Sequence, residues 1–166
     1  MSKALLKNYQ DTVRKEWIDY NGHLNDGYYA VAFSLAAETF LDHIGLYLDY
    51  REKTQCTLYT VETHIVYLRE LKEFAPIEIA WRLMGFDSKR IHIFQEMRHA
   101  QANYVAATCE VMFLHVNQKG IARASAMPEE SLAILEALLE THSKLQTPVQ
   151  AGRKIELKMK SSKTKP

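Results

Sequence analysis

Residues 28–44 form a helical run that is apolar around most of its circumference. One stripe repeats at helical spacing and consists of Tyr29, Ala32, Phe33, Ala36, Phe40 and Ile44. Apolar side chains also lie outside this stripe, so the helix must be covered on most sides. Asn25 and Asp26 supply capping oxygens before it, and Gly45 stands where a positive φ is favoured after it. The sequence therefore predicts a buried central helix.

Four strand-like runs follow this helix, at residues 56–69, 77–86, 89–99 and 104–116. Their short connections favour antiparallel neighbours. Residues 10–18 are predicted as a first strand, residues 46–55 as a polar connector, and residues 128–142 as a second helix that opens at a proline. This pattern predicts an α+β fold in which a curved antiparallel β-sheet wraps around the long helix, because each then covers the other's apolar face.

The composition indicates one globular domain. The chain has 166 residues with 25% charged residues, and we assign residues 1–146 to the domain and 147–166 to a basic tail whose end is disordered. A formal net charge of +1 argues against a nucleic-acid-binding protein, and no apolar run approaches the length of a membrane span. Neither a signal peptide nor metal-ligand spacing is visible, so we expect a cytoplasmic protein in which Cys56 and Cys109 are reduced thiols.

The segment before the helix carries the chemistry, and it reads Trp-Ile-Asp-Tyr-Asn-Gly-His-Leu-Asn-Asp-Gly over residues 17–27. Asp19 stands at a predicted strand end, and the helix N-terminus that follows offers unpaired N–H groups for an oxygen that becomes negative during acyl transfer. Asp19 could attack a carbonyl as a nucleophile or activate water as a general base, and the sequence does not separate these routes. His23 and Asn25 are further catalytic candidates, although Asn25 also suits a helix cap. Gly22 permits the turn.

The Asp-x-x-Gly-His-x-Asn pattern formed by Asp19, Gly22, His23 and Asn25 resembles the hotdog-fold acyl-CoA thioesterases of the 4-hydroxybenzoyl-CoA thioesterase-like group. The resemblance covers roughly residues 12–116. Residues 59–71 and 89–94 are similar to the betainyl-CoA thioesterases of carnitine degradation. The broader resemblance implies a hotdog fold, hydrolysis of acyl-CoA, and a homodimer, possibly paired into a tetramer, with active sites between subunits. The narrower resemblance implies betainyl-CoA as the substrate.

Aromatic residues gather around the proposed site, and we assign Trp17, Tyr20, Tyr28 and Tyr29 to substrate binding. A quaternary ammonium has no N–H to donate, so aromatic faces suit it. Ordinary core packing of these rings is the alternative.

Polar side chains later in the chain are weaker candidates. Glu62 and His64 are predicted to share a strand face with Thr60 and Val66, where they would either join the site or lie on a partly solvated surface. Glu38 is a further acid. Lys89 and Arg90, or Arg153 and Lys154 in the tail, could bind the phosphates of CoA.

No Walker glycine loop, Gly-x-Ser-x-Gly elbow or His-Glu-x-x-His motif is visible, so no metal or cofactor is implied. Two alternatives to a betainyl-CoA thioesterase stay open: a thioesterase for other short or aromatic acyl-CoA, and a non-catalytic module that binds acyl-CoA.

Overall fold

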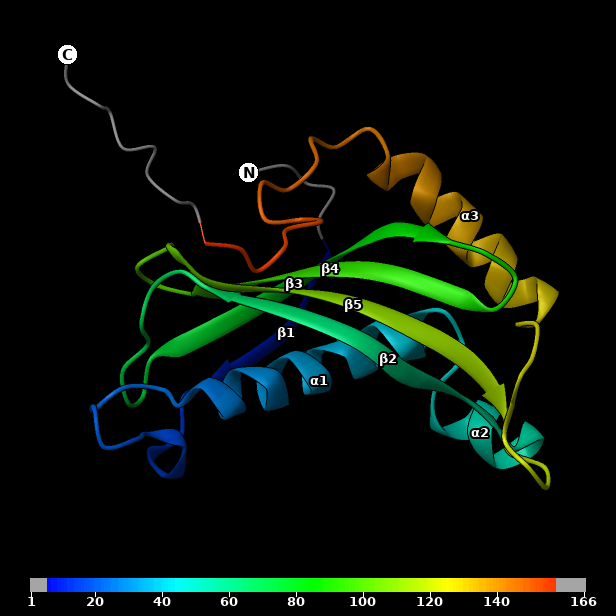
Figure 1. The fold of residues 1–166 in the computed structure, drawn as a ribbon, viewed down its shortest axis with the longest axis horizontal. Coiled ribbons are helices and arrows are strands. Elements are labelled where there is room, and N and C mark those ends of the chain that lie inside the picture. The colour runs from blue at the N-terminus through cyan, green and yellow to red at the C-terminus, as the bar shows by residue number, and fades with distance from the viewer. Residues whose placement is uncertain (1–5, 158–166) are drawn as a thin grey trace, which may run out of the picture.

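The computed structural model describes residues 6–157 (Figure 1). The strands are β1 Leu6–Thr12, β2 Cys56–Tyr67, β3 Pro76–Phe86, β4 Arg90–His99, β5 Val105–Asn117 and β6 Arg123–Ala124. The helices are α1 Asp26–His43, α2 Leu48–Thr54 and α3 Glu129–His142, and a short 3₁₀ turn spans Lys15–Trp17. No helix within residues 6–157 is long and apolar enough to cross a membrane.

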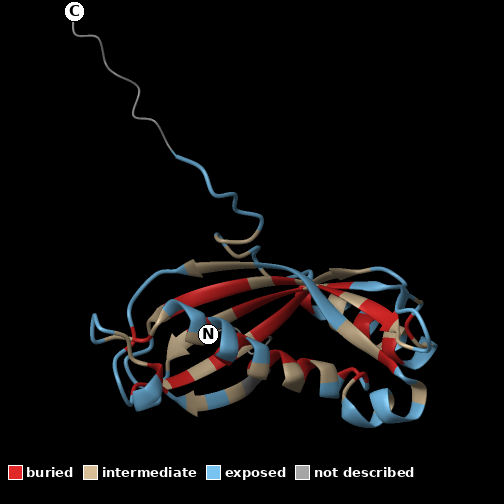
Figure 2. Ribbon diagram, turned by 60° about the horizontal axis from the view of Figure 1, so that its bottom comes forward, coloured by how far each residue is buried: buried red, intermediate tan, exposed pale blue. Residues whose placement is uncertain are grey.

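The long strands form one antiparallel sheet in the order β1-β3-β4-β5-β2, and the short β6 pairs with the last residues of β5. The curved sheet wraps around α1, which lies along its inner face (Figure 1). Buried residues concentrate on α1 and on the central strands (Figure 2). The predicted α+β architecture, a hotdog fold with a long central helix, is confirmed.

Small residues let α1 approach the sheet closely. Ala32 and Ala36 are fully buried, and the Phe40 ring meets Trp81 of β3 edge-on with 4.8 Å between ring centroids. Interlocking of large and small side chains of this kind produces the high packing density of protein cores. The predicted positive φ of Gly45 is also confirmed, at 74°.

Helix α3 packs on β3. Among the described residues, the pairing of β1 with β3 reaches Leu6, which lies opposite Trp81. Just beyond, the Leu83 N–H donates to Nδ1 of the buried His142 at the end of α3, at 3.0 Å. The predicted helix is confirmed, with Pro128 as its N-cap residue.

Two predicted segments differ from the structure. The strand expected at residues 10–18 is β1, which ends at Thr12, and a 3₁₀ turn follows it. Val13 and Trp17 are both buried, and their spacing of four residues fits a helical turn as well as an alternating strand. The polar connector at residues 46–55 contains α2, which has no buried residue and therefore no apolar stripe to reveal it.

A β-bulge corrects the predicted faces of β2. Thr60 pairs with Phe113 and Glu62 with Met112, so Val61 is an extra residue in the ladder. A bulge of this kind reverses the side-chain alternation beyond it. Thr60 therefore faces α1, whereas Glu62 and His64 still share a face, which is the outer face of the sheet. The expectation that Thr60 shares their face was wrong.

Candidate active site

A tight hairpin turn carries Asp19. Ile18 and Leu24 form an isolated antiparallel bridge. Between them, the Gly22 N–H donates to the Asp19 carbonyl and the Asp19 N–H donates to the His23 carbonyl, both at 3.0 Å. The φ of Gly22 is 76°, as three-residue hairpin loops with a glycine bulge require. The predicted need for glycine at this position follows from this conformation.

The Asp19 carboxylate is largely shielded from solvent, with a side-chain exposure of 14%. The Asn21 N–H donates to its Oδ1 at 2.8 Å, which fixes the side chain in an Asx turn. His23 Nδ1 lies 3.8 Å from the same oxygen, too far for a hydrogen bond. Within the described residues Oδ2 has no hydrogen-bond partner, so one oxygen of a held carboxylate is available for chemistry.

The first turn of α1 lies beside this carboxylate and is partly occupied by its own cap. The Asn25 side chain accepts from the Gly27 N–H at 3.0 Å, and the Asn25 carbonyl accepts from the Tyr28 N–H at 3.0 Å. The Asp26 N–H has no partner within residues 6–157. It is therefore the first-turn amide open to a negative oxygen, and Asn25 serves as the cap that the sequence favoured.

These features border a surface hollow of about 510 Å³, here called the Asp19 hollow. Its lining residues are Asp19, Tyr20, Asn21, His23, Leu24, Asn25, Asp26, Tyr29, Tyr67, Leu68, Arg69 and Glu70. The Tyr29 and Tyr67 rings meet edge to face with centroids 5.2 Å apart, and the Tyr67 hydroxyl donates to the Asp26 carbonyl at 3.2 Å. Burial raises the pKa of Tyr29 to about 12, so this phenol stays neutral at physiological pH. The hollow thus joins aromatic surface to carboxylates.

Residues 13–138 match the family described as the thioesterase-like superfamily. The chain belongs to this superfamily. It is 39% identical over 153 residues to the betainyl-CoA thioesterase of Pseudomonas aeruginosa, and the match covers 92% of this chain and 96% of that protein. It is also 39% identical to the L-carnitine dehydrogenase/betainyl-CoA thioesterase of a Rhizobium species, over 85% of this chain and 28% of that longer protein.

Solved structures agree with this membership. A hypothetical protein of Staphylococcus aureus in complex with CoA superposes with a TM-score of 0.84 at 31% identity, covering 95% of this chain and all of that chain. A putative thioesterase of Pseudomonas putida gives a TM-score of 0.79 at 33% identity and covers 93% of this chain and 98% of that chain.

Of the aromatic residues expected around the site, two line the Asp19 hollow and two do not. Tyr29 lines the Asp19 hollow, and Tyr20 stands at its rim with 96% of its surface exposed. Trp17 and Tyr28 instead stack on each other behind the turn, with centroids 5.6 Å apart, and line no part of the hollow. Sequence reasoning missed Tyr67, although its place at the end of a long strand was visible.

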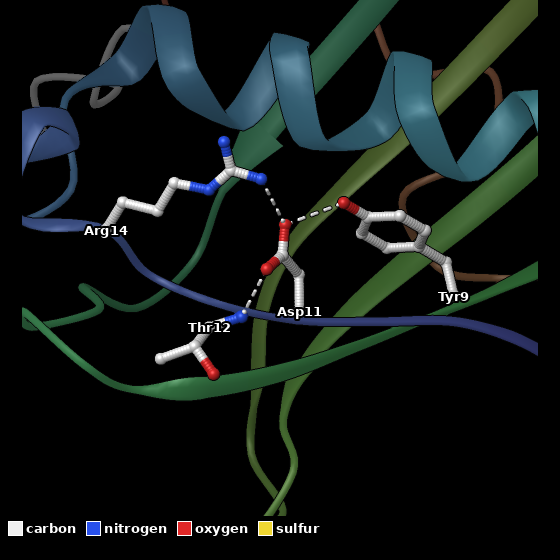
Figure 3. Close-up of polar contacts among 4 residues, drawn as sticks. All are labelled: Tyr9, Asp11, Thr12 and Arg14. Carbon is white, nitrogen blue, oxygen red and sulfur yellow. Dashed lines mark hydrogen bonds and ion pairs between the residues drawn. The ribbon is translucent and has the colours of Figure 1, made fainter.

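Tyr9, Asp11 and Arg14 form a group of polar contacts, here called the brace (Figure 3), and Arg14 of this group contacts Trp17. Asp11 accepts hydrogen bonds from the Tyr9 hydroxyl at 2.7 Å and from Arg14 at 3.3 Å, and the Arg14 guanidinium lies 4.7 Å from the centre of the Trp17 ring. The Trp17 carbonyl accepts from the Asn25 N–H at 2.9 Å. The brace therefore connects β1 to the start of α1.

Glu62 and His64 do not join Asp19 within the chain. They line a separate hollow on the outer sheet face together with His92, Glu110 and Arg153. There His92 Nε2 lies 2.7 Å from a carboxylate oxygen of Glu110. The Gly152 N–H, which precedes the predicted CoA-binding pair Arg153 and Lys154, donates to the other Glu110 oxygen at 2.7 Å. Residues 158–166 of the basic tail lie outside the described residues.

Lys89 and Arg90 lie at the far end of β4 from the Asp19 hollow. Tyr104 lies at the near end of β4, where the His99 N–H donates to its carbonyl at 3.0 Å, and its hydroxyl donates to the carbonyl oxygen of Glu70, a residue of the hollow, at 2.9 Å. The ten residues of β4 span about 30 Å. Arg90 is also bound by Asp87, at 2.6 Å. Among residues 6–157, Arg69 is the arginine that lines the hollow, and its guanidinium lies 3.9 Å from the centre of the Tyr104 ring. Sequence reasoning missed this residue.

No group of three or more His, Cys, Asp or Glu side chains in the described part of the chain is arranged to hold a metal ion. Cys56 and Cys109 are free and buried, in agreement with their expected thiol state.

Proposed function

We propose that this chain hydrolyses betainyl-CoA to glycine betaine and CoA in the Asp19 hollow. The observation that carries the proposal is the shielded Asp19 carboxylate, which has a free oxygen beside the open Asp26 N–H and the Tyr29–Tyr67 pair. The identity to a protein named betainyl-CoA thioesterase over 96% of that protein supports the choice of substrate.

The reaction needs a base or nucleophile and a donor for the developing oxyanion. With Asp19 as general base, its carboxylate takes a proton from water, the oxygen of that water bonds to the thioester carbon, and the carbon–sulfur bond breaks. The thiolate of CoA then receives the proton. With Asp19 as nucleophile, the same departure leaves a mixed anhydride that water hydrolyses. In both routes the Asp26 N–H would donate to the carbonyl oxygen as it becomes negative.

The cationic acyl group fits the same hollow. The nitrogen of a betainyl group lies two bonds from the carbonyl carbon, about 2.5 Å away, so it must be recognised next to Asp19. Tyr29 and Tyr67 offer aromatic surface there, and Asp26 offers negative charge. A cation on such faces gains about 0.5–2 kcal/mol. This arrangement favours a cationic acyl group over a neutral one of equal size.

The test compares betainyl-CoA with 3,3-dimethylbutanoyl-CoA, in which carbon replaces nitrogen, by following release of the CoA thiol. We expect betainyl-CoA to react with the higher kcat/KM. Asp19→Asn keeps an oxygen for the Asn21 N–H and should lower kcat by a factor of about 10²–10⁴. The control Asp49→Asn, on exposed α2, should retain activity. Equal turnover of the two thioesters, or an active Asp19→Asn variant, would refute the proposal.

We further propose a homodimer formed along β2. This strand is twelve residues long, has no neighbour on its outer side among residues 6–157, and exposes Tyr59 and Val61. A second copy paired antiparallel there would satisfy the open edge. It would also bring Lys89 and Arg90 of the partner subunit to the end of the sheet that holds Asp19, where they could bind CoA phosphates. Analytical ultracentrifugation tests the dimer.

We also propose that the protein works in the cytoplasm, because its free thiols suit a reducing compartment.

A further inference from the structure

A carboxylate and an imidazole lie side by side on the open edge of the sheet. Glu62 and His64 are two residues apart on β2 and line the same hollow on the outer sheet face. Neither side chain has a hydrogen bond or ion pair within residues 6–157. The facing carboxylate on β5, Glu110, is already occupied by His92 at one oxygen and by the Gly152 N–H at the other. The edge therefore presents two unpaired groups that attract each other when the imidazole is protonated.

Side-chain direction limits how a second copy can pair with this edge. Directly opposed residues of two antiparallel strands point to the same side of the sheet. Allowed registers therefore set inward-facing residues of one copy opposite inward-facing residues of the other. Glu62 and His64 face outward, so an allowed register pairs them with outward-facing residues. The inward-facing residues of β2 line one cavity together with α1, and they include Leu58, Thr60, Thr63 and Ile65.

Charge distinguishes the allowed registers. A two-fold axis at Glu62 or at His64 would place that residue opposite its own copy, and like charges in such positions destabilise a sheet. An axis at the bulge would place Glu62 opposite Tyr59 and leave both charges unpaired. An axis at Thr63 places Glu62 opposite the partner's His64, and the symmetry repeats this pair on the other side of the axis. Opposite charges in such positions stabilise a sheet.

The same register accommodates the bulge. Past the charged pairs, the partner's extra residue Val61 shifts the pairing by one, which places Ile65 opposite the partner's Thr60. Both of these side chains face α1. The next pair is Val66 opposite the partner's Tyr59, whose ring is exposed in the single chain. Inward and outward sides therefore stay matched on both sides of the bulge.

We propose that two reciprocal ion pairs, each between Glu62 of one copy and His64 of the other, fix the register of the β2 homodimer and make its assembly pH-dependent. The partner that this edge fits is a second copy of the chain, because two-fold symmetry supplies the opposite charge to both residues at once. Histidine gains its charge at the acidic end of the physiological range. The dimer should therefore be tighter at about pH 5.5 than at about pH 8.

The surroundings of His64 leave its charge to this pair. Within the described residues, the hollow holds no carboxylate other than Glu62 and the occupied Glu110. The other charged or titratable groups there are His92 and Arg153. Glu62 of the same copy is about 6.6 Å away along the strand, whereas Cβ atoms of directly opposed residues are about 5 Å apart. The partner's carboxylate is therefore the nearer one.

Charge reversal tests the ion pairs, with the dimer Kd measured by analytical ultracentrifugation at pH 5.5 and pH 8. We expect the Kd of the unaltered chain to be about threefold or more higher at pH 8. Glu62→Lys and His64→Glu each oppose like charges twice and should raise Kd at pH 5.5 by about tenfold or more. The double variant restores opposite charges and should return Kd to within about threefold. Glu136→Lys, at an exposed position of α3, is the matched control and should leave Kd unchanged.

Disulfide formation tests the register independently, in a Cys56→Ser background. Thr63 lies opposite its own copy at the proposed axis, with Cβ atoms about 5 Å apart, so Thr63→Cys should form an intermolecular disulfide on oxidation. Thr60 lies about 15 Å from its own copy, so Thr60→Cys should not. This measurement leaves Glu62 and His64 unaltered and does not depend on the folding of the charge-reversed variants.

The inference rests on the proposed β2 homodimer. It is overturned if the charge reversals leave Kd unchanged, if the double variant is as weak as the single ones, or if Thr60→Cys crosslinks and Thr63→Cys does not. An unaltered chain that stays monomeric overturns the dimer and the inference together. Release of CoA from betainyl-CoA by the same samples reports on the proposed hydrolysis separately.

Discussion

Replacing Gly22 by alanine tests whether the Asp19 turn depends on a left-handed backbone. An added Cβ would meet no atom within 4 Å, so the cost arises from the φ of 76° alone. The left-handed conformation costs a residue with a Cβ about 1–2 kcal/mol of conformational free energy, and this cost is smaller for asparagine than for alanine. We therefore expect Gly22→Ala to lower the free energy of unfolding by about 1–2 kcal/mol, and Gly22→Asn by less than about 1 kcal/mol.

The effect on kcat should distinguish Gly22, which holds the Asp19 turn, from Gly45, which does not. If alanine relaxes the turn, Asp19 shifts, and a displacement of about 1 Å can lower kcat by about 100-fold. Gly45→Ala is the control, because its φ of 74° and open surroundings are similar but it follows the other end of α1. It should lose similar stability and keep its kcat.

Urea unfolding gives the stabilities, and release of CoA from betainyl-CoA gives kcat. The reasoning is refuted if alanine and asparagine at position 22 are equally stable. It is also refuted if Gly22→Ala loses no more activity than Gly45→Ala.

Three further predictions follow from burial and charge. Phe40→Ala removes a ring packed on Trp81 and should lower the free energy of unfolding by about 3–5 kcal/mol, measured by urea titration. Hydrogen bonds from the Lys89 N–H and from Arg90 lower the pKa of Asp87 to about 2 from 3.8. The contribution of Asp87 to the free energy of unfolding is therefore present above pH 4 and lost as the pH falls towards 2. The stability difference between the unaltered chain and Asp87→Asn should therefore shrink over that range. Burial raises the pKa of Cys109 to about 12, so in a Cys56→Ser background it should react with a thiol reagent at pH 8 only after unfolding.

The fold was predictable because its strongest signals are periodic. The apolar stripe through Ala32, Ala36 and Phe40 specified a covered helix, and the alternation through Ile91, Ile93 and Met97 specified a sheet with one apolar face. Segment 46–55 escaped prediction because α2 buries no side chain, so its helical conformation leaves no trace in the apolar pattern. Local sequence therefore predicts an element where that element packs on the core.

The candidate site was predictable only where its parts are close in sequence. Asp19, Gly22, His23 and Asn25 lie within seven residues, and one hairpin turn with its helix cap holds them together. Tyr67 reaches the same hollow from the far end of β2, and its inward orientation depends on the bulge at Val61. A bulge is a one-residue change of register that alternating polarity does not reveal, so the sequence left open whether Glu62 and His64 join the site or lie on a partly solvated surface.

The open edge of β2 and the remote position of Lys89 have one common explanation in the proposed dimer. Antiparallel pairing of two β2 strands places the Cys56 end of one copy against the Tyr67 end of the other. Cys56 is paired with Asn117, and Arg90 with Leu114, so the turn that holds Lys89 lies at the Cys56 end of its own sheet. The pairing that satisfies the open edge therefore moves this turn from the opposite end of the sheet to the end that holds the partner's Asp19. In a monomer, Lys89 would lie far from the hollow, and Arg69 would be the arginine available there to CoA. A lower affinity of Lys89→Ala for CoA is therefore expected from the dimer and not from a monomer.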